Sequence, residues 1–132
     1  MAQRGREHIA VIGSGAWGTT LSLVAAQAGN SVSLYVRDAD TATLMRASRR
    51  NQHYLLDVEI PESIDITADL ETACRDAALI LLVVPSQTMR ENIRAVAPHI
   101  GDAFVISAAK GLDRASLKRM TEVIREEIAD GP

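Results

Sequence analysis

The sequence predicts a doubly wound α/β fold, in which helices cover both faces of a mostly parallel sheet. Short apolar runs alternate with amphipathic helical patterns along the whole chain, which is the order of elements that gives such a sheet. The apolar run at 77–84 contains no charged residue, as expected for an inner strand that is buried on both faces. A glycine-rich turn directly follows the first apolar run, at Gly13 to Gly18.

The composition is that of one ordinary globular domain. The chain has 132 residues, of which 47% are hydrophobic and 23% charged, and its net charge is −3. This charge argues against a nucleic-acid-binding module, which usually has a concentrated basic face. No apolar stretch approaches the ~20 residues of a membrane span, and residues 1–7 do not resemble a signal peptide. With a single cysteine, Cys74, we expect a packing role for that residue and a reducing, cytoplasmic location.

The first apolar run, residues 8–12, is expected to form the first strand. A helix should then run from about Trp17 and end at Gly29-Asn30, since glycine commonly follows the last turn of a helix. The apolar residues at the helical period, expected on its inner face, are Leu21, Val24, Ala25 and Ala28.

A second strand is expected at 32–36, followed by Arg37. Asp38 or Asp40 should cap a helix that runs to about Arg50. Residues 51–65 are expected to form an extended loop, because Pro61 argues against regular structure there.

The second half of the chain continues the alternation of strands and helices. The expected elements are an edge strand at 64–67, a small helix at 70–74, the apolar strand at 77–84, a helix with Met89, Ile93 and Val96 that stops before Pro98, and a strand at 104–106. A last helix is expected to carry Leu117, Met120, Ile124 and Ile128 on its inner face.

The glycine-rich turn has the sequence Gly13-Ser14-Gly15-Ala16-Trp17-Gly18. In a Rossmann-type domain the first glycine permits the tight turn, and the second removes a side chain where a pyrophosphate must approach. The third glycine, Gly18, lets the helix pack close to the strand, and the N-terminus of that helix faces the phosphates. We therefore expect all six residues to bind NAD or NADP.

Other residues indicate which kind of nucleotide the turn would bind. A phosphate-binding P-loop is excluded because Thr19 rather than Lys follows Gly18, whereas a methyltransferase also uses a glycine turn and stays open at this point. An acid at the end of the second strand would favour NAD, and an arginine there would favour NADP. Arg37 precedes Asp38, so we favour NADP with NAD tolerated.

Four segments, in the same order and spacing, resemble bacterial NAD(P)-dependent glycerol-3-phosphate dehydrogenase. They are Gly13 to Leu21, Asn51-Gln52-His53-Tyr54-Leu55 with Ile60-Pro61 and Ile64, Val84-Pro85-Ser86-Gln87, and Lys110-Gly111-Leu112. The later three segments separate this family from methyltransferases.

The resemblance implies roles for individual residues. Ala16, Trp17 and Pro85 would contact the cofactor, and Arg37 and Tyr54 would lie at its adenosine end. Lys110 would reach both the cofactor and the phosphate substrate, which would be dihydroxyacetone phosphate or glycerol 3-phosphate. The sequence departs from the family at Ala16, where serine is usual, and at Leu56, where proline is expected.

The resemblance also implies a second, largely helical domain that supplies the catalytic lysine. The chain stops at Pro132, so we expect it to be an N-terminal part that binds the cofactor but is inactive alone, with no catalytic residue of its own. Without a second domain, apolar surface at the sheet edge or on the last helix would be exposed, and such surface can drive formation of a homo-oligomer.

Two other functions stay open on the sequence. One is a stand-alone NAD(P)-binding sensor or degenerate module without catalysis. The other is a related dehydrogenase that acts on a hydroxy acid or on ketopantoate. His8, His53 and His99 lie far apart in the sequence, and we expect no metal site.

Overall fold

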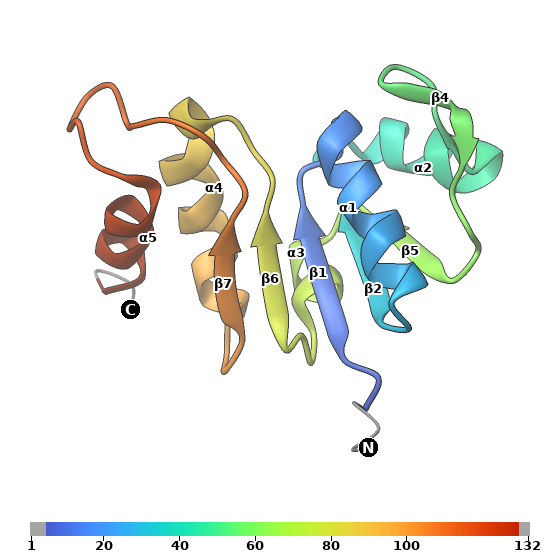
Figure 1. Cartoon of the computed structure of the whole chain (residues 1–132), viewed down its shortest axis with the longest axis horizontal. Helices are drawn as coiled ribbons and strands as arrows, with labels where there is room; N and C mark the ends of the chain where they lie inside the picture. Colours follow the sequence, from blue (N-terminus) through green and yellow to red (C-terminus); the bar gives the residue numbers. More distant parts are fainter. Residues whose placement is uncertain (1–4, 130–132) are drawn as a thin grey trace.

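The computed structural model describes residues 5–129, and a five-stranded parallel sheet lies at its centre (Figure 1). The strand order is β5-β2-β1-β6-β7, and all four pairings are parallel. The chain thus builds outward from β1 in one direction and then returns to build in the other, which confirms the doubly wound α/β fold. The strands are β1 His8–Ile12, β2 Ser31–Tyr35, β5 Ile64–Thr67, β6 Leu79–Leu82 and β7 Phe104–Ser107.

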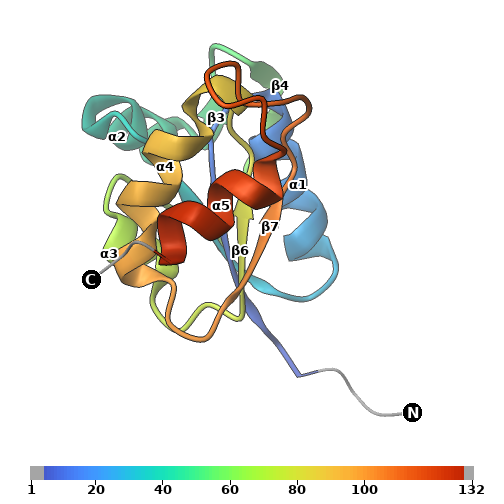
Figure 2. The same ribbon diagram turned by 90° about the vertical axis from the view of Figure 1, so that its left-hand side faces the viewer.

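Helices cover both faces of this sheet, as the sequence predicts (Figures 1 and 2). Helices α1 (Ala16–Gln27) and α2 (Ala39–Ser48) pack on one face, where Val11 and Leu34 are fully buried. The other face carries α3 (Leu70–Cys74), α4 (Met89–Val96) and α5 (Met120–Ala129), packed over Ile12 and Ile80. Alternate residues of the central strand β1 therefore belong to two separate apolar cores.

Helix α1 buries only part of the face that the sequence predicts, because Ala25 packs against the core whereas Val24 and Ala28 do not. Its buried residues are Gly18, Thr19 and Ser22, whereas Val24 is 54% exposed and Ala28 is exposed beyond the helix end. The helix lies so close to β1 that only small residues fit between them. The Ser22 hydroxyl is satisfied because it donates to the Gly18 carbonyl oxygen at 2.9 Å. Close approach here takes precedence over apolar periodicity.

The expected loop at 51–65 is also wrong in its first part. Strands β3 (Arg50–Asn51) and β4 (Leu55–Glu59) form an antiparallel two-stranded sheet, with an irregular register between Arg50 and Asn51. No glycine marks the turn between them, so the usual sequence signal for a hairpin is missing. Ile60, which is 1% exposed, then anchors the end of the hairpin in the core beneath α2.

The last helix begins later than predicted. Leu117 lies before it, with a φ of 57° and a side chain that is 74% exposed. Met120, Val123 and Ile124 form the buried face, and Ile128 is 40% exposed. The segment between β7 and α5 reverses direction at Leu117, which shifts the helix start to Met120.

One face of the sheet is incompletely covered at β6 and β7. Phe104 is 79% exposed and Ile106 is 48% exposed, on the face that α1 and α2 cover elsewhere. Leu79 and Leu81 are only half-buried on the same face, whereas Ile80 and Leu82 are fully buried, so the inner strand β6 is fully covered on one face only. Apolar surface is therefore exposed at this sheet edge, as expected, while its effect on oligomerisation stays a prediction. Within residues 5–129, no helix has the length and apolar character that a membrane crossing requires.

Candidate functional site

The glycine turn lies where the strand order reverses, between the carboxyl ends of β1 and β6. Gly13 has a φ of 122°, and a Cβ atom on it would lie 2.0 Å from the carbonyl oxygen of Val83. No other residue can occupy this position without moving the end of β6. In open α/β sheets, ligands bind in this crevice outside the carboxyl ends of the strands.

Gly18 allows helix α1 to contact the turn. A Cβ atom on Gly18 would lie 1.9 Å from the carbonyl oxygen of Gly13, which is closer than any real contact. Gly15 differs, because a Cβ atom there would meet no atom within 4 Å. Gly13 and Gly18 are thus required by packing, whereas the missing side chain of Gly15 leaves open space in front of the helix.

The N-terminus of α1 faces this open space. No side chain caps the helix at Gly15, and its first turn contains no acidic residue. The first amide groups of a helix have no partner within it, and they carry a partial positive charge that favours an anion. The turn is suited to a phosphate group.

Asn51 holds the glycine turn in place by hydrogen bonds, a role that the sequence analysis did not assign. Its side-chain amide donates to the Ser14 carbonyl oxygen at 2.7 Å and to the Thr19 hydroxyl at 2.9 Å, and the residue is 3% exposed. Asn51 opens the second of the four segments that resemble the dehydrogenase family, which is the one sequence signal for it. The β3–β4 hairpin is thereby fastened to the glycine turn.

A cavity of about 510 Å³ lies over the glycine turn. It brings together seven of the predicted site residues, namely Gly13, Ser14, Gly15, Ala16, Arg37, Tyr54 and Pro85. Three others do not line it: Trp17 is 58% exposed beside it, Gly18 is buried beneath the turn, and Lys110 lies on the loop after β7. A second cavity of about 180 Å³ adjoins the first and shares Ile12, Tyr35, Arg37 and Asn92 with it.

Arg37 and Asp38 have separate partners. The Arg37 guanidinium donates to Glu91 of helix α4 at 3.2 Å. Asp38 is the N-cap of α2, where its carboxylate accepts from the Thr41 hydroxyl at 2.6 Å and from the Thr41 amide at 2.8 Å. These two hydrogen bonds lower the pKa of Asp38. Of the two charged residues after β2, Arg37 lines the cavity and Asp38 does not.

Gln87 joins the turn after β6 to the loop that carries Lys110. Its side-chain amide donates to the Leu112 carbonyl oxygen at 3.0 Å, and its amide oxygen accepts from the Arg114 backbone at 3.2 Å. Gly111 has a φ of 101° and lies against Ser86, because a Cβ atom on it would be 3.4 Å from the Ser86 hydroxyl oxygen. The segments at 84–87 and 110–112, which both resemble the dehydrogenase family, are therefore neighbours in space.

A network of ion pairs fixes the same loop to helices α4 and α5. Arg90 contacts Glu127 at 2.7 Å, Glu126 at 3.1 Å and Asp113 at 3.3 Å. Arg94 contacts Glu127 at 2.6 Å, and its hydrogen bond, with that of Arg90, lowers the pKa of Glu127. The pKa of Asp113 is lowered first by its hydrogen bond from Ser116 and then by Arg90. The loop therefore has a defined position although most of its residues are exposed.

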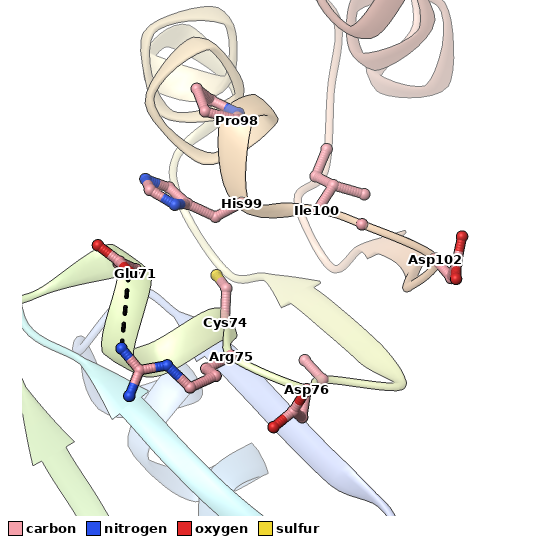
Figure 3. A pocket seen from close by; sticks show the side chains of 10 residues that line it. Glu71, Cys74, Arg75, Asp76, Pro98, His99, Ile100 and Asp102 are labelled. Carbon is pink, nitrogen blue, oxygen red and sulfur yellow. Dashed lines mark ion pairs between the residues drawn. The ribbon is translucent and has the colours of Figure 1, made fainter.

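Another hollow, of about 550 Å³, lies at the opposite end of the sheet, between α3 and the segment 98–102 (Figure 3). Its charged lining includes Arg75, which pairs with Glu71 at 3.6 Å, and it shares no residue with the glycine turn. Burial raises the pKa of the Cys74 thiol to about 11, so this thiol is protonated and unreactive. Among residues 5–129, no group of three or more His, Cys, Asp or Glu side chains is placed to hold a metal ion.

Comparison with known proteins decides between the families that share such a glycine turn. Residues 8–132 match the family model described as the N-terminus of NAD-dependent glycerol-3-phosphate dehydrogenase. The chain belongs to this dehydrogenase family. The resemblance seen in the four sequence segments is therefore confirmed.

The similarity to individual members of this family extends over most of the chain. It is 42% identical over 126 residues to glycerol-3-phosphate dehydrogenase (NAD(P)+) of Corynebacterium jeikeium (strain K411), a match that covers 95% of this chain and 38% of that protein. It is 44% identical over 117 residues to glycerol-3-phosphate dehydrogenase (NAD(P)+) 2 of Mycobacterium tuberculosis (strain H37Rv), with 88% and 35% covered.

A solved structure agrees with this assignment. The crystal structure of glycerol-3-phosphate dehydrogenase from Coxiella burnetii superposes with a TM-score of 0.86 at 32% identity, over 95% of this chain and 38% of that one. The chain thus spans well under half the length of the relatives that it matches.

Proposed function

We propose that this chain binds NADP and NAD over the glycine turn, as the cofactor domain of an oxidoreductase. The oxidoreductase would interconvert dihydroxyacetone phosphate and sn-glycerol 3-phosphate. One observation carries the proposal. In a single cavity at the carboxyl ends of β1 and β6, the fold collects the glycine turn, Arg37, Tyr54 and Pro85. The names of the related dehydrogenases support the substrate.

The residues present fit a dinucleotide. Gly15 leaves open space in front of the uncapped N-terminus of α1, where a pyrophosphate would receive backbone hydrogen bonds. The cavity of about 510 Å³ falls within the usual range for small-molecule sites, roughly 300–1,000 Å³. Arg37, on the rim, offers a cation to a 2′-phosphate, and for this reason we propose that NADP is favoured over NAD.

The nicotinamide of the bound cofactor would supply the hydride. The chain's own residues would bind and orient it: the turn would hold the pyrophosphate, and Pro85 would border the cavity beside the end of β6. Lys110 is exposed on a loop that Gln87 fixes beside this turn, and there it would meet the substrate phosphate. The general acid–base group would come from a second, helical domain, so we expect residues 1–132 alone to bind the cofactor without turnover. The relatives' names point to a metabolic enzyme, and we propose a cytoplasmic location.

The test is a titration of the chain with NADPH and then with NADH, followed by tryptophan fluorescence. Trp17 is the only tryptophan and lies in the glycine turn, so a nicotinamide bound nearby should quench its emission. We expect saturable quenching with both cofactors, and Arg37→Ala should weaken the binding of NADPH more than the binding of NADH. Arg75→Ala serves as the matched control, because Arg75 is an exposed, ion-paired arginine at the opposite end of the sheet.

A folded chain that shows no saturable change with either cofactor would contradict the cofactor site. The substrate is tested separately, by oxidation of NADPH with dihydroxyacetone phosphate in the full-length protein. Turnover of a hydroxy acid instead would contradict the proposed substrate. Full activity of residues 1–132 alone would contradict the need for a second domain.

A further inference from the structure

We propose that Glu91 sets the preference of this site between the 2′-hydroxyl of NAD and the 2′-phosphate of NADP. This inference rests on the proposed cofactor site and adds a residue that lies outside the glycine turn and outside strand β2. The Glu91 carboxylate lies 3.2 Å from the Arg37 guanidinium. Arg37 follows β2, whereas Glu91 lies in the first turn of α4, so only the fold brings them together.

The pair lies on the rim of the second, smaller cavity. That cavity of about 180 Å³ has apolar walls from Ile12, Leu70, Ala95 and Val96, and Arg37 and Glu91 supply its charged groups. An apolar slot with a polar rim suits a purine nucleoside, whose base is flat and whose ribose is polar. Because this cavity adjoins the one over the glycine turn, a dinucleotide bound there would reach it with its adenosine end.

The acid next to Arg37 in the sequence is not available for this role. Asp38 accepts two hydrogen bonds from Thr41 as the N-cap of α2, and it lines neither cavity. In many dinucleotide-binding domains an acid after the second strand bonds the ribose hydroxyl. Here α4 brings a carboxylate to the place where that acid would act.

The chemistry of the pair predicts opposite effects on the two cofactors. A 2′-phosphate carries a charge of about −1.5 to −2 and would seek the same guanidinium as the Glu91 carboxylate. The two anions would then be neighbours, and their repulsion would partly cancel the attraction of Arg37. The 2′-hydroxyl of NAD is neutral, and an ionised carboxylate accepts hydrogen bonds from hydroxyl groups well. Glu91 therefore lowers the affinity for NADPH and leaves that for NADH unchanged or raises it.

The pair itself is easy to open. Its side chains are 76% and 66% exposed, and ion pairs this exposed contribute little to stability. Arg37 can therefore turn to a phosphate when NADPH binds, while the negative charge of Glu91 stays in place. On this basis the chain accepts both cofactors, with Glu91 reducing the advantage that Arg37 alone would give to NADPH.

The test compares dissociation constants for NADPH and NADH in the wild-type chain and in Glu91→Gln, measured by Trp17 fluorescence at low and moderate salt. We expect Glu91→Gln to bind NADPH about tenfold more tightly at low salt, and less so at moderate salt, where charges are screened. Binding of NADH should not become tighter. In the Arg37→Ala background the gain should fall to about twofold or less, because the phosphate is no longer held beside residue 91.

Glu62→Gln is the matched control, because Glu62 is an exposed glutamate paired with Arg49 at 3.1 Å, and it lines neither cavity. An unchanged ratio of the two affinities in Glu91→Gln, beside a wild-type chain that binds both cofactors, would overturn this inference and leave the proposed function standing. An equal change in Glu62→Gln would also overturn it, by showing an effect of net charge alone. A folded wild-type chain that binds neither cofactor would overturn the proposed function itself.

Discussion

Gly18→Ala should destabilise the fold, whereas Gly15→Ala should mainly weaken cofactor binding, although both glycines belong to the same turn. At Gly18 the new Cβ atom would lie 1.9 Å from the Gly13 carbonyl oxygen and 2.8 Å from the carbonyl carbon. Both neighbours are backbone, so helix α1 must move away from β1. Overpacking of this kind costs about 1–3 kcal/mol or more, and with backbone on both sides we expect at least about 3 kcal/mol.

Gly15→Ala should leave the fold almost unchanged. Its φ is −69°, which any residue adopts, and no atom lies within 4 Å of the new Cβ atom. Alanine is a poorer N-cap than glycine, by up to about 1 kcal/mol. It also restricts the unfolded chain more, which stabilises by about 0.4–1 kcal/mol, so the two effects nearly cancel. The Cβ atom would nonetheless occupy the space in front of α1, and we expect at least about a tenfold loss of NADPH affinity, or about 1.4 kcal/mol.

Thermal unfolding followed by circular dichroism, together with the NADPH titration, measures both effects. For a chain of this size 1 kcal/mol corresponds to about 3–5 °C, so Gly18→Ala should lower the Tm by at least about 10 °C. The Tm of Gly15→Ala should stay within about 3 °C of the wild-type value. A Gly18→Ala chain with the wild-type Tm would refute the packing argument. A Gly15→Ala chain with wild-type affinity would refute the placement of the pyrophosphate.

Three further predictions concern the loop network and the buried thiol. Folding lowers the pKa of Asp113 and of Glu127, so these two carboxylates stabilise the fold fully above their unfolded pKa values of about 4. This stabilisation is lost as the pH falls through their folded pKa values. The urea midpoint should therefore drop on acidification, and it should drop less steeply in Glu127→Gln. Cys74, with its pKa raised to about 11, should react with a thiol reagent at neutral pH only after unfolding, and rapid labelling of the native chain would contradict its burial. Gln87→Leu should speed amide hydrogen exchange at Arg114, because the Arg114 N–H donates to the Gln87 side chain. The control Gln27→Leu changes an exposed residue of α1 and should leave this exchange rate unchanged. Equal rates in both variants would show that Gln87 does not hold the loop.

The sequence predicted the strands and most helices well, and its errors have identifiable causes. Residues 51–65 were expected to be a loop because Pro61 and the absence of a turn glycine hid a hairpin with an irregular register. The inner face of α1 was assigned only in part, because Ala25 packs against the core but Val24 is exposed. The fully buried residues of the helix are the small ones, Gly18, Thr19 and Ser22, since the helix lies close to β1. Periodicity reports average burial and carries no information on how near two elements lie.

The sequence by itself determined the fold class, the glycine turn and the family, because these depend on local patterns: alternating apolar runs, and glycines directly after a strand. Only the tertiary structure decided which side chains meet around the turn. Asn51 supports Ser14 from 37 positions away, Gln87 holds Leu112 from 25 positions away, and Glu91 pairs with Arg37 across 54 positions. Such contacts arise when strands far apart in the chain become neighbours in the sheet and bring their following turns to one edge, and no local sequence pattern encodes that distance.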